Sequence, residues 1–175
     1  MHIAQNGRTA LMAAANCGAM DVDRQFHSQC IKNAPTIATL LIRHAANRAE
    51  ERTMDMTNKQ GQTALMLAAS RGHQKLVELL LEKGAQSNLA NPFGMTALHM
   101  ACKQGHVEVV DLLVDKHRSE GGADPDLKES RKGYTPLMVA AMMGHTDIVR
   151  ALLERVHGTS LNLQVRCLWT VVVFM

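Results

Sequence analysis

A four-residue segment that begins with Thr recurs four times along this chain and constrains its fold more than any other feature. It reads Thr-Ala-Leu-Met, Thr-Ala-Leu-Met, Thr-Ala-Leu-His and Thr-Pro-Leu-Met, starting at Thr9, Thr63, Thr96 and Thr135. A Gly precedes each Thr by two residues, and the spacings between successive Gly residues are 54, 33 and 39. Self-similarity at a period of roughly 20 to 50 residues indicates a stack of small units, each of which buries its apolar surface against its neighbours.

The rest of each unit follows the same order. A pair of small residues comes after the segment, then Gly18 or a Gly-His turn, then an apolar stretch such as residues 76–81. This pattern resembles the ankyrin repeat, which has a period of about 33 residues and a Thr-Pro-Leu-His-x-Ala signature. The resemblance implies an all-α repeat fold, an α-solenoid of four stacked helix-turn-helix units with β-turn fingers. The predicted domain, residues 1–164, holds units at about 4–56, 57–88, 89–126 and 127–164, and surplus residues such as the insertion 22–36 are placed between helices.

The residue types in the units agree with this local structure. The Thr that starts each unit is a good N-cap, because its hydroxyl accepts a hydrogen bond from a free backbone N–H in the first helical turn. Pro136 then takes the first helical position, where its missing N–H costs nothing. Gly72, Gly105 and Gly144 can adopt the left-handed conformation that ends such a helix. The sequence therefore predicts a short first helix between each Thr and the following Gly.

A second helix is predicted from the apolar stretch of each unit. In the second unit, one wide helical stripe is formed by Leu76, Val77, Leu79, Leu80 and Leu81. The Lys and Glu residues beside this stripe are expected to face water, and Gly84 is expected to end the helix. Because one unit cannot bury both of its faces alone, we expect the stability to be roughly a sum over neighbouring units.

Composition and charge exclude several classes of protein. Of 175 residues, 46% are hydrophobic and 3% aromatic, so we expect a core of small and flexible side chains. The 19 Lys and Arg exceed the 16 Asp and Glu too slightly to indicate specific nucleic-acid binding. Four scattered Cys without a C-x-x-C pair favour reduced thiols and an intracellular location, cytoplasmic or nuclear. No stretch has the pattern of a signal peptide or the length of a membrane span.

No catalytic or phosphate-binding motif occurs in the sequence, so no enzyme activity and no cofactor are predicted. His99, Cys102 and His106 have a spacing that could suggest a zinc site. However, His99 is the signature residue of its unit, Cys102 replaces a packing Ala, and His106 belongs to the Gly-His turn, so no metal is predicted either. The turn His recurs once per unit, at His73, His106 and His145, and is therefore predicted to bond the backbone.

The resemblance implies that a partner protein binds the concave side, an extended surface without a pocket that is formed by the fingers and the exposed side of the first helices. Nine residues are predicted to contact the partner: Arg71, Phe93, Met95, Met100, Lys103, Gln104, Tyr134, Met142 and Met143. Leu67, Lys132 and Val139 map to the same side. Aromatic, Met and Arg side chains are enriched at the centres of interfaces, and Met surfaces adapt to their partners. The alternative is that Met142 and Met143 pack against an adjacent unit.

Two functions are compatible with these features. The first is a non-catalytic protein-interaction module, and the second is the regulatory or targeting part of a longer multidomain protein, such as an enzyme or a channel. Residues 165–175 form an apolar tail at the place where another unit would be expected. We therefore hypothesise that the natural array continues and that this chain is truncated. We expect a monomer whose exposed ends favour aggregation.

Overall fold

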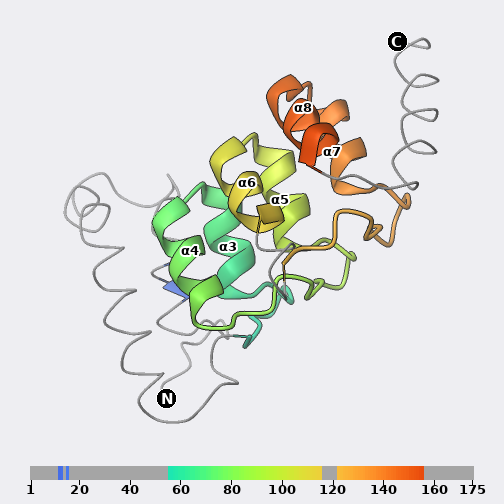
Figure 1. The fold of residues 1–175 in the computed structure, drawn as a ribbon. Coiled ribbons are helices and arrows are strands. Elements are labelled where there is room, and N and C mark those ends of the chain that lie inside the picture. The colour runs from blue at the N-terminus through green and yellow to red at the C-terminus, as the bar shows by residue number, and fades with distance from the viewer. Residues whose placement is uncertain (1–11, 14, 16–54, 116–121, 156–175) are drawn as a thin grey trace, which may run out of the picture.

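The computed structural model describes residues 12, 13, 15, 55–115 and 122–155. In this part of the chain, six helices follow one another as three pairs (Figure 1). The pairs are α3 (Ala64–Arg71) with α4 (Gln74–Glu82), α5 (Ala97–Gln104) with α6 (Val107–Asp115), and α7 (Pro136–Met142) with α8 (Thr146–Arg155). The predicted all-α repeat architecture is confirmed. Most of the first unit, the insertion 22–36 and the tail 165–175 lie outside the described residues.

The helices stack in two layers (Figure 1). The first helices α3, α5 and α7 pack in succession against one another, and the second helices α4, α6 and α8 do the same. Ala68, Ala101 and Ala140 are fully buried in the first layer, where their small side chains let neighbouring helices approach closely. Large buried side chains come from every pair, and they include Leu65, Leu80, Leu98, Leu113, Leu137, Ile148 and Leu152. The core therefore runs along the stack instead of lying at one centre.

The predicted helix caps are present in all three described pairs. The hydroxyls of Thr63, Thr96 and Thr135 accept hydrogen bonds from the backbone N–H three residues later, at 3.2, 3.5 and 3.4 Å. Pro136 occupies the first turn of α7, as expected. The Gly that follows the first helix has a positive φ in each pair, although the C-cap of α7 is Met143, one residue before Gly144. These local signals were sufficient to place the first helices.

The turn His of one unit bonds the backbone of the preceding unit. His106 Nε2 lies 3.3 Å from the carbonyl oxygen of Ser70, and His145 Nε2 lies 3.3 Å from that of Lys103. The predicted backbone bond is therefore confirmed for these two histidines. The backbone carbonyl that His73 would bond in the same way belongs to the first unit and lies outside the described residues.

The same histidines explain why the turn residue of the preceding unit is Gly. Gly72 and Gly105 have φ values of 73° and 83°, which L-residues with a Cβ rarely adopt. A Cβ atom on Gly72 would lie 2.6 Å from His106 Nδ1, and one on Gly105 would lie 2.8 Å from His145 Cε1. Both the backbone conformation and the close approach of the next unit therefore require Gly.

Gly105→Ala is expected to lower the free energy of unfolding by about 2 kcal/mol, because it adds a steric conflict with His145 to the strain of a positive φ. Gly84→Ala is the matched control, since Gly84 also has a positive φ, 82°, but no described atom lies within 4 Å of its added Cβ. The control is expected to lose about 1 kcal/mol. Urea unfolding followed by circular dichroism measures both values. Equal losses would show that the close contact with His145 contributes nothing.

The fingers that precede the three helix pairs are short turns, each closed by a backbone N–H···O bond. These bonds join Asn58 to Gln62 at 3.0 Å, Asn91 to Met95 at 3.1 Å, and Glu129 to Tyr134 at 2.9 Å. In the first two fingers the Asn side chain accepts two backbone N–H bonds inside the turn. The third finger, 129–134, is one residue longer, and the Glu129 carboxylate accepts the bonds instead. Ser130 N–H donates to the Phe93 carbonyl at 2.8 Å, so adjacent fingers are joined.

Asn and Asp side chains also link the loops that precede successive fingers. The Asp55 carboxylate accepts a hydrogen bond from Gln86 N–H at 3.0 Å, 31 residues further along the chain. One unit later, Asn88 accepts from Asp124 N–H at 2.7 Å and donates to the Gly122 carbonyl at 3.2 Å. These bonds hold successive loops in register, and with them the fingers that the loops lead into.

Candidate functional site

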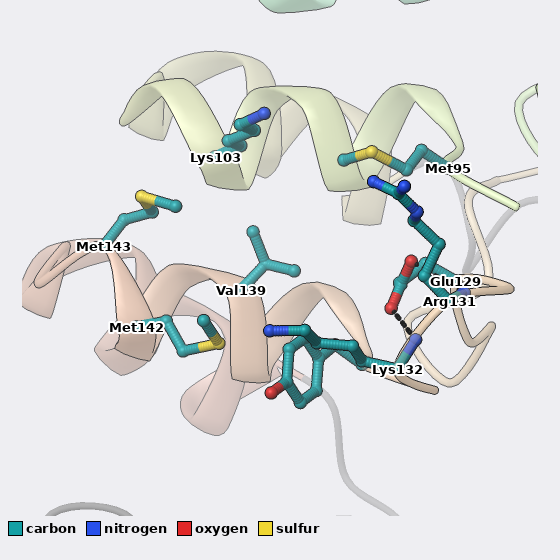
Figure 2. Close-up of a pocket in the computed structure, with 9 residues that line it drawn as sticks. Met95, Lys103, Glu129, Arg131, Lys132, Val139, Met142 and Met143 are labelled. Carbon is teal, nitrogen blue, oxygen red and sulfur yellow. Dashed lines mark hydrogen bonds between the residues drawn. The ribbon is translucent and has the colours of Figure 1, made fainter. Parts of the chain in front are cut away.

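A groove of about 330 Å³ lies between α5, α7 and the finger 129–134 (Figure 2). It is lined by Met95, Lys103, Glu129, Arg131, Lys132, Tyr134, Val139, Met142 and Met143. The expectation of a concave side without any pocket is therefore wrong for this part of the surface. The physical reason is that the long side chains of the finger stand beside the exposed faces of two helices and enclose a hollow between them.

The apolar wall of the groove comes from one face of α7 and its C-terminal end. Val139, Met142 and Met143 lie three and four residues apart, so their side chains share one helical face. Val139 is buried, whereas Met142 and Met143 are 49% and 47% exposed. Lys103 lies across the groove on α5 (Figure 2). The wall is thus formed by flexible thioethers that face a cation.

The finger 129–134 supplies the charged rim. The Glu129 carboxylate accepts hydrogen bonds from the backbone N–H groups of Arg131, at 3.0 Å, and Lys132. Burial by itself raises the pKa of Glu129, but these backbone bonds and a further one from Tyr134 outweigh it and hold the pKa below its ordinary value. Glu129 therefore stays ionised while its oxygens stabilise the turn that carries the two cations.

Both finger cations lie over aromatic rings. The Arg131 guanidinium carbon is 5.6 Å from the centre of the Phe93 ring, and Lys132 Nζ is 5.6 Å from the centre of the Tyr134 ring. Such contacts contribute about 0.5–1 kcal/mol each at exposed sites. They favour conformations in which the two cations stay at the rim of the groove.

Five of the nine predicted contact residues line this groove, namely Met95, Lys103, Tyr134, Met142 and Met143. Phe93 is not in the lining but lies against Arg131, which is. The other three do not line it: Arg71 and Gln104 are exposed at the C-terminal ends of α3 and α5, and Met100 is half-buried on α5.

Of the three further residues that map to this side, two line the groove and one is buried. Val139 and Lys132 line the groove, but Leu67 is buried, because α3 packs directly against α5 at this side of the stack. Glu129 and Arg131 line the groove and were not predicted. The only sequence signal for them was the additional residue before Gly133, which lengthens the finger.

The His99, Cys102 and His106 spacing does not create a ligand set in the structure. His99 Nδ1 accepts a bond from Thr96 N–H at 3.3 Å, and its Nε2 lies 3.1 Å from the Tyr134 carbonyl oxygen. Cys102 is fully buried, and His106 is bonded to the preceding unit. Among the described residues, no group of three His, Cys, Asp or Glu side chains is arranged to hold a metal ion.

The Cys102 thiol is expected to react with iodoacetamide at least about 100-fold more slowly in the folded chain than in urea, because only the thiolate is nucleophilic. Burial raises the pKa of Cys102 to about 12, so little thiolate forms at pH 8. Mass spectrometry of the peptide that contains Cys102 measures the rate, and the same peptide in denatured protein is the control. Equal rates in the folded and denatured states would contradict the buried position.

No helix in residues 55–115 or 122–155 combines the length and the hydropathy that a membrane crossing requires. This finding concerns the described helices alone.

Comparison with known proteins gives matches along most of the chain. A family model described as ankyrin repeats (3 copies) matches residues 1–91, 26–129 and 86–165. The chain is 34% identical over 114 residues to protein fem-1 homolog A-like from Mus musculus, covering 62% of this chain and 16% of that protein. It is 32% identical over 153 residues to ankyrin repeat and KH domain-containing protein mask-1 from Caenorhabditis elegans, covering 87% of this chain and 5% of that protein. The chain thus spans a small part of the length of both relatives.

Proposed function

Since the chain belongs to the ankyrin repeat family, we propose that it is a non-catalytic protein-interaction module, which binds a partner protein on the side formed by α3, α5, α7 and the fingers. Ankyrin repeats are in general protein-interaction modules. The binding face is proposed from where the apolar surface of the described repeats is exposed.

The distribution of exposed apolar side chains carries this proposal. Among the described residues, the exposed large hydrophobic side chains are Phe93, Met142, Met143 and Leu153. Three of the four lie in or beside the groove, and Leu153 lies on α8. Exposed apolar surface that gathers at one place and is surrounded by charge is typical of a protein-binding site.

Capture from a cell extract by the immobilised full chain, with quantitative mass spectrometry, tests this face. Phe93→Ala/Met142→Ala/Met143→Ala is expected to lose a bound partner by about 10-fold or more, because such side chains supply most of the binding energy at an interface. The matched control, Lys75→Ala/Glu78→Ala/Leu153→Ala, changes exposed side chains on the second helices and is expected to retain the partner. A partner that survives the first triple substitution and is lost in the control would overturn the proposal.

A second candidate function is that of the interaction part of a longer protein with a regulatory or targeting role. The length of the relatives favours it, because the chain covers only 16% and 5% of the two described above. An immunoblot of tissue extract with an antibody against residues 122–155 separates the two. A band much larger than the 175-residue chain supports this candidate, and a band of that size alone contradicts it.

We further propose that the module acts in the cytoplasm or the nucleus. The support is that Cys102, which the structure describes, is a free thiol in the core and belongs to no disulfide. A fluorescent fusion confined to the secretory pathway would contradict this location.

A further inference from the structure

We propose that the groove between α5, α7 and the finger 129–134 binds an acidic peptide segment that carries large apolar side chains. This inference rests on the proposed function, since it specifies the chemistry of the partner at the same face. Three features of the structure support it: the sign of the charge on the two helix layers, the cations at the rim of the groove, and the apolar wall of the groove.

Acidic residues are confined to one layer of the helix stack. The first helices α3, α5 and α7 contain no Asp or Glu, whereas the second helices α4, α6 and α8 contain seven. The charged residues within the first helices are Arg71 and Lys103, both cations near a helix end. The side that holds the groove is therefore positive although the chain as a whole carries a net charge of only +3.

Three cations converge on the groove, and none of them forms an ion pair within the part of the chain that the structure describes. Lys103 comes from α5, and Arg131 and Lys132 come from the finger. Glu129 is the sole carboxylate in the lining, and its oxygens accept the backbone N–H bonds of the finger. The Arg131 guanidinium lies over the Phe93 ring and makes no hydrogen bond within the described part of the chain, so its N–H donors are available for a carboxylate.

The wall below these cations is apolar and adaptable. Met142 and Met143 are about half exposed, and Val139 and Tyr134 complete the surface beside them. The volume, about 330 Å³, is at the lower end of the range for ligand sites, which suits one or two side chains of an extended segment better than a whole helix. A segment with apolar side chains in the groove and carboxylates on either side would contact the apolar wall and pair with the cations of the rim at the same time.

The same surface suits a nucleic acid poorly. Single-stranded RNA requires open aromatic faces on which bases stack and a continuous basic track along its phosphates. Here Lys132 and Arg131 lie over Tyr134 and Phe93, and the second helices carry acidic residues. Charge complementarity therefore favours carboxylates that are interspersed with apolar side chains.

Fluorescence anisotropy with the full chain and labelled synthetic octapeptides tests the proposal. The probe is Glu-Asp-Leu-Glu-Phe-Asp-Leu-Glu; one comparison peptide replaces its acidic residues by Lys, and another replaces Leu and Phe by Ser. We expect the probe to bind at least about 10-fold more tightly than either comparison peptide, and its affinity to fall as salt is raised. A dodecamer of uridine is the nucleic-acid comparison.

Charge reversal then locates the site. Lys103→Glu/Lys132→Glu is expected to weaken binding of the acidic probe by about 10-fold or more, whereas Lys75→Glu/Arg150→Glu, the same change on the second helices, leaves it unaltered. All four residues are exposed, so thermal melting should show both variants folded. Equal binding of acidic and basic peptides, tighter binding of the uridine dodecamer, or equal effects of the two charge reversals would overturn the proposal. If no peptide binds while the Phe93/Met142/Met143 triple variant loses its partner, this inference fails and the proposed function stands.

Discussion

His99→Ala is expected to lower the free energy of unfolding by about 3 kcal/mol, because it removes a buried side chain together with its hydrogen bonds. His99 is fully buried. Its Nδ1 accepts from the N–H of Thr96, which starts the same helix, and its Nε2–H donates to the carbonyl of Tyr134, in the next finger. One side chain thus caps α5 and joins the third unit to the fourth. Urea unfolding of both proteins at pH 8 measures the loss.

His99→Met is the matched variant, since Met66 and Met138 take the same place in the neighbouring units. Met fills much of the volume but can neither accept from Thr96 N–H nor donate to the Tyr134 carbonyl. We expect it to recover about half of the loss, because it restores packing without restoring the bonds. If His99→Met is as stable as the wild type at pH 8, the hydrogen bonds contribute nothing and the explanation is wrong.

The stability is also expected to depend on pH through His99. Burial lowers the pKa of His99, although the bond to the Tyr134 carbonyl and the charge of Glu129 act in the opposite direction. Because the folded state has the lower pKa, it binds fewer protons than the unfolded state once the pH falls below about 6.5. The contribution of neutral His99 is thus complete above pH 6.5 and is lost as the pH falls through the folded pKa.

The comparison with His99→Met isolates this effect. Burial also lowers the pKa of His73, which therefore adds a loss of the same sign in both proteins. Unfolding measured between pH 8 and pH 5 should show a steeper decline for the wild type than for the variant. Parallel declines would contradict the assignment to His99.

Features of the fold that depend on local chemistry were predictable from the sequence. Thr63 and Pro136 act within a few residues of their own position, so their roles as cap and first helical residue follow from residue type alone. The turn His was predictable because it lies at the same distance after the starting Thr in the second, third and fourth units. Its partner was not, since that carbonyl group belongs to the preceding unit and only the stacking distance places it there.

The site was predictable only in part, because helical spacing gives the exposed face of a helix but not what stands opposite. Met142 and Met143 follow directly from that spacing. Met100 takes the place on α5 that Val139 takes on α7, but it is half-buried and does not line the groove, since α5 packs against both α3 and α7. Arg131 lines the groove because the finger 129–134 is one residue longer than its neighbours. The spacing in the sequence shows that the finger has an additional residue, but it does not show which side chains then lie at the rim of the groove.

Leu113→Ala is expected to lower the free energy of unfolding by about 3–5 kcal/mol, because it opens a cavity that its neighbours fill only partly. Leu113 is fully buried on α6, which packs against α4, α5 and α8. In a stack whose stability is a sum over neighbouring interfaces, truncation of a core side chain on a helix that packs against both neighbouring units is expected to weaken two of these interfaces at once.

Leu153→Ala is the control for this substitution, because Leu153 lies on the adjacent helix α8 and is 41% exposed. It is expected to lose less than about 1 kcal/mol. Urea unfolding gives both the free energy and its slope with denaturant, which reports the surface exposed in the transition. Loss of stability with an unchanged slope means that the array still unfolds as one unit, whereas a lower slope means that the units on the two sides of Leu113 unfold separately. Equal losses for the two Leu variants would contradict the position of Leu113 in the core, because burial is the principal difference between them.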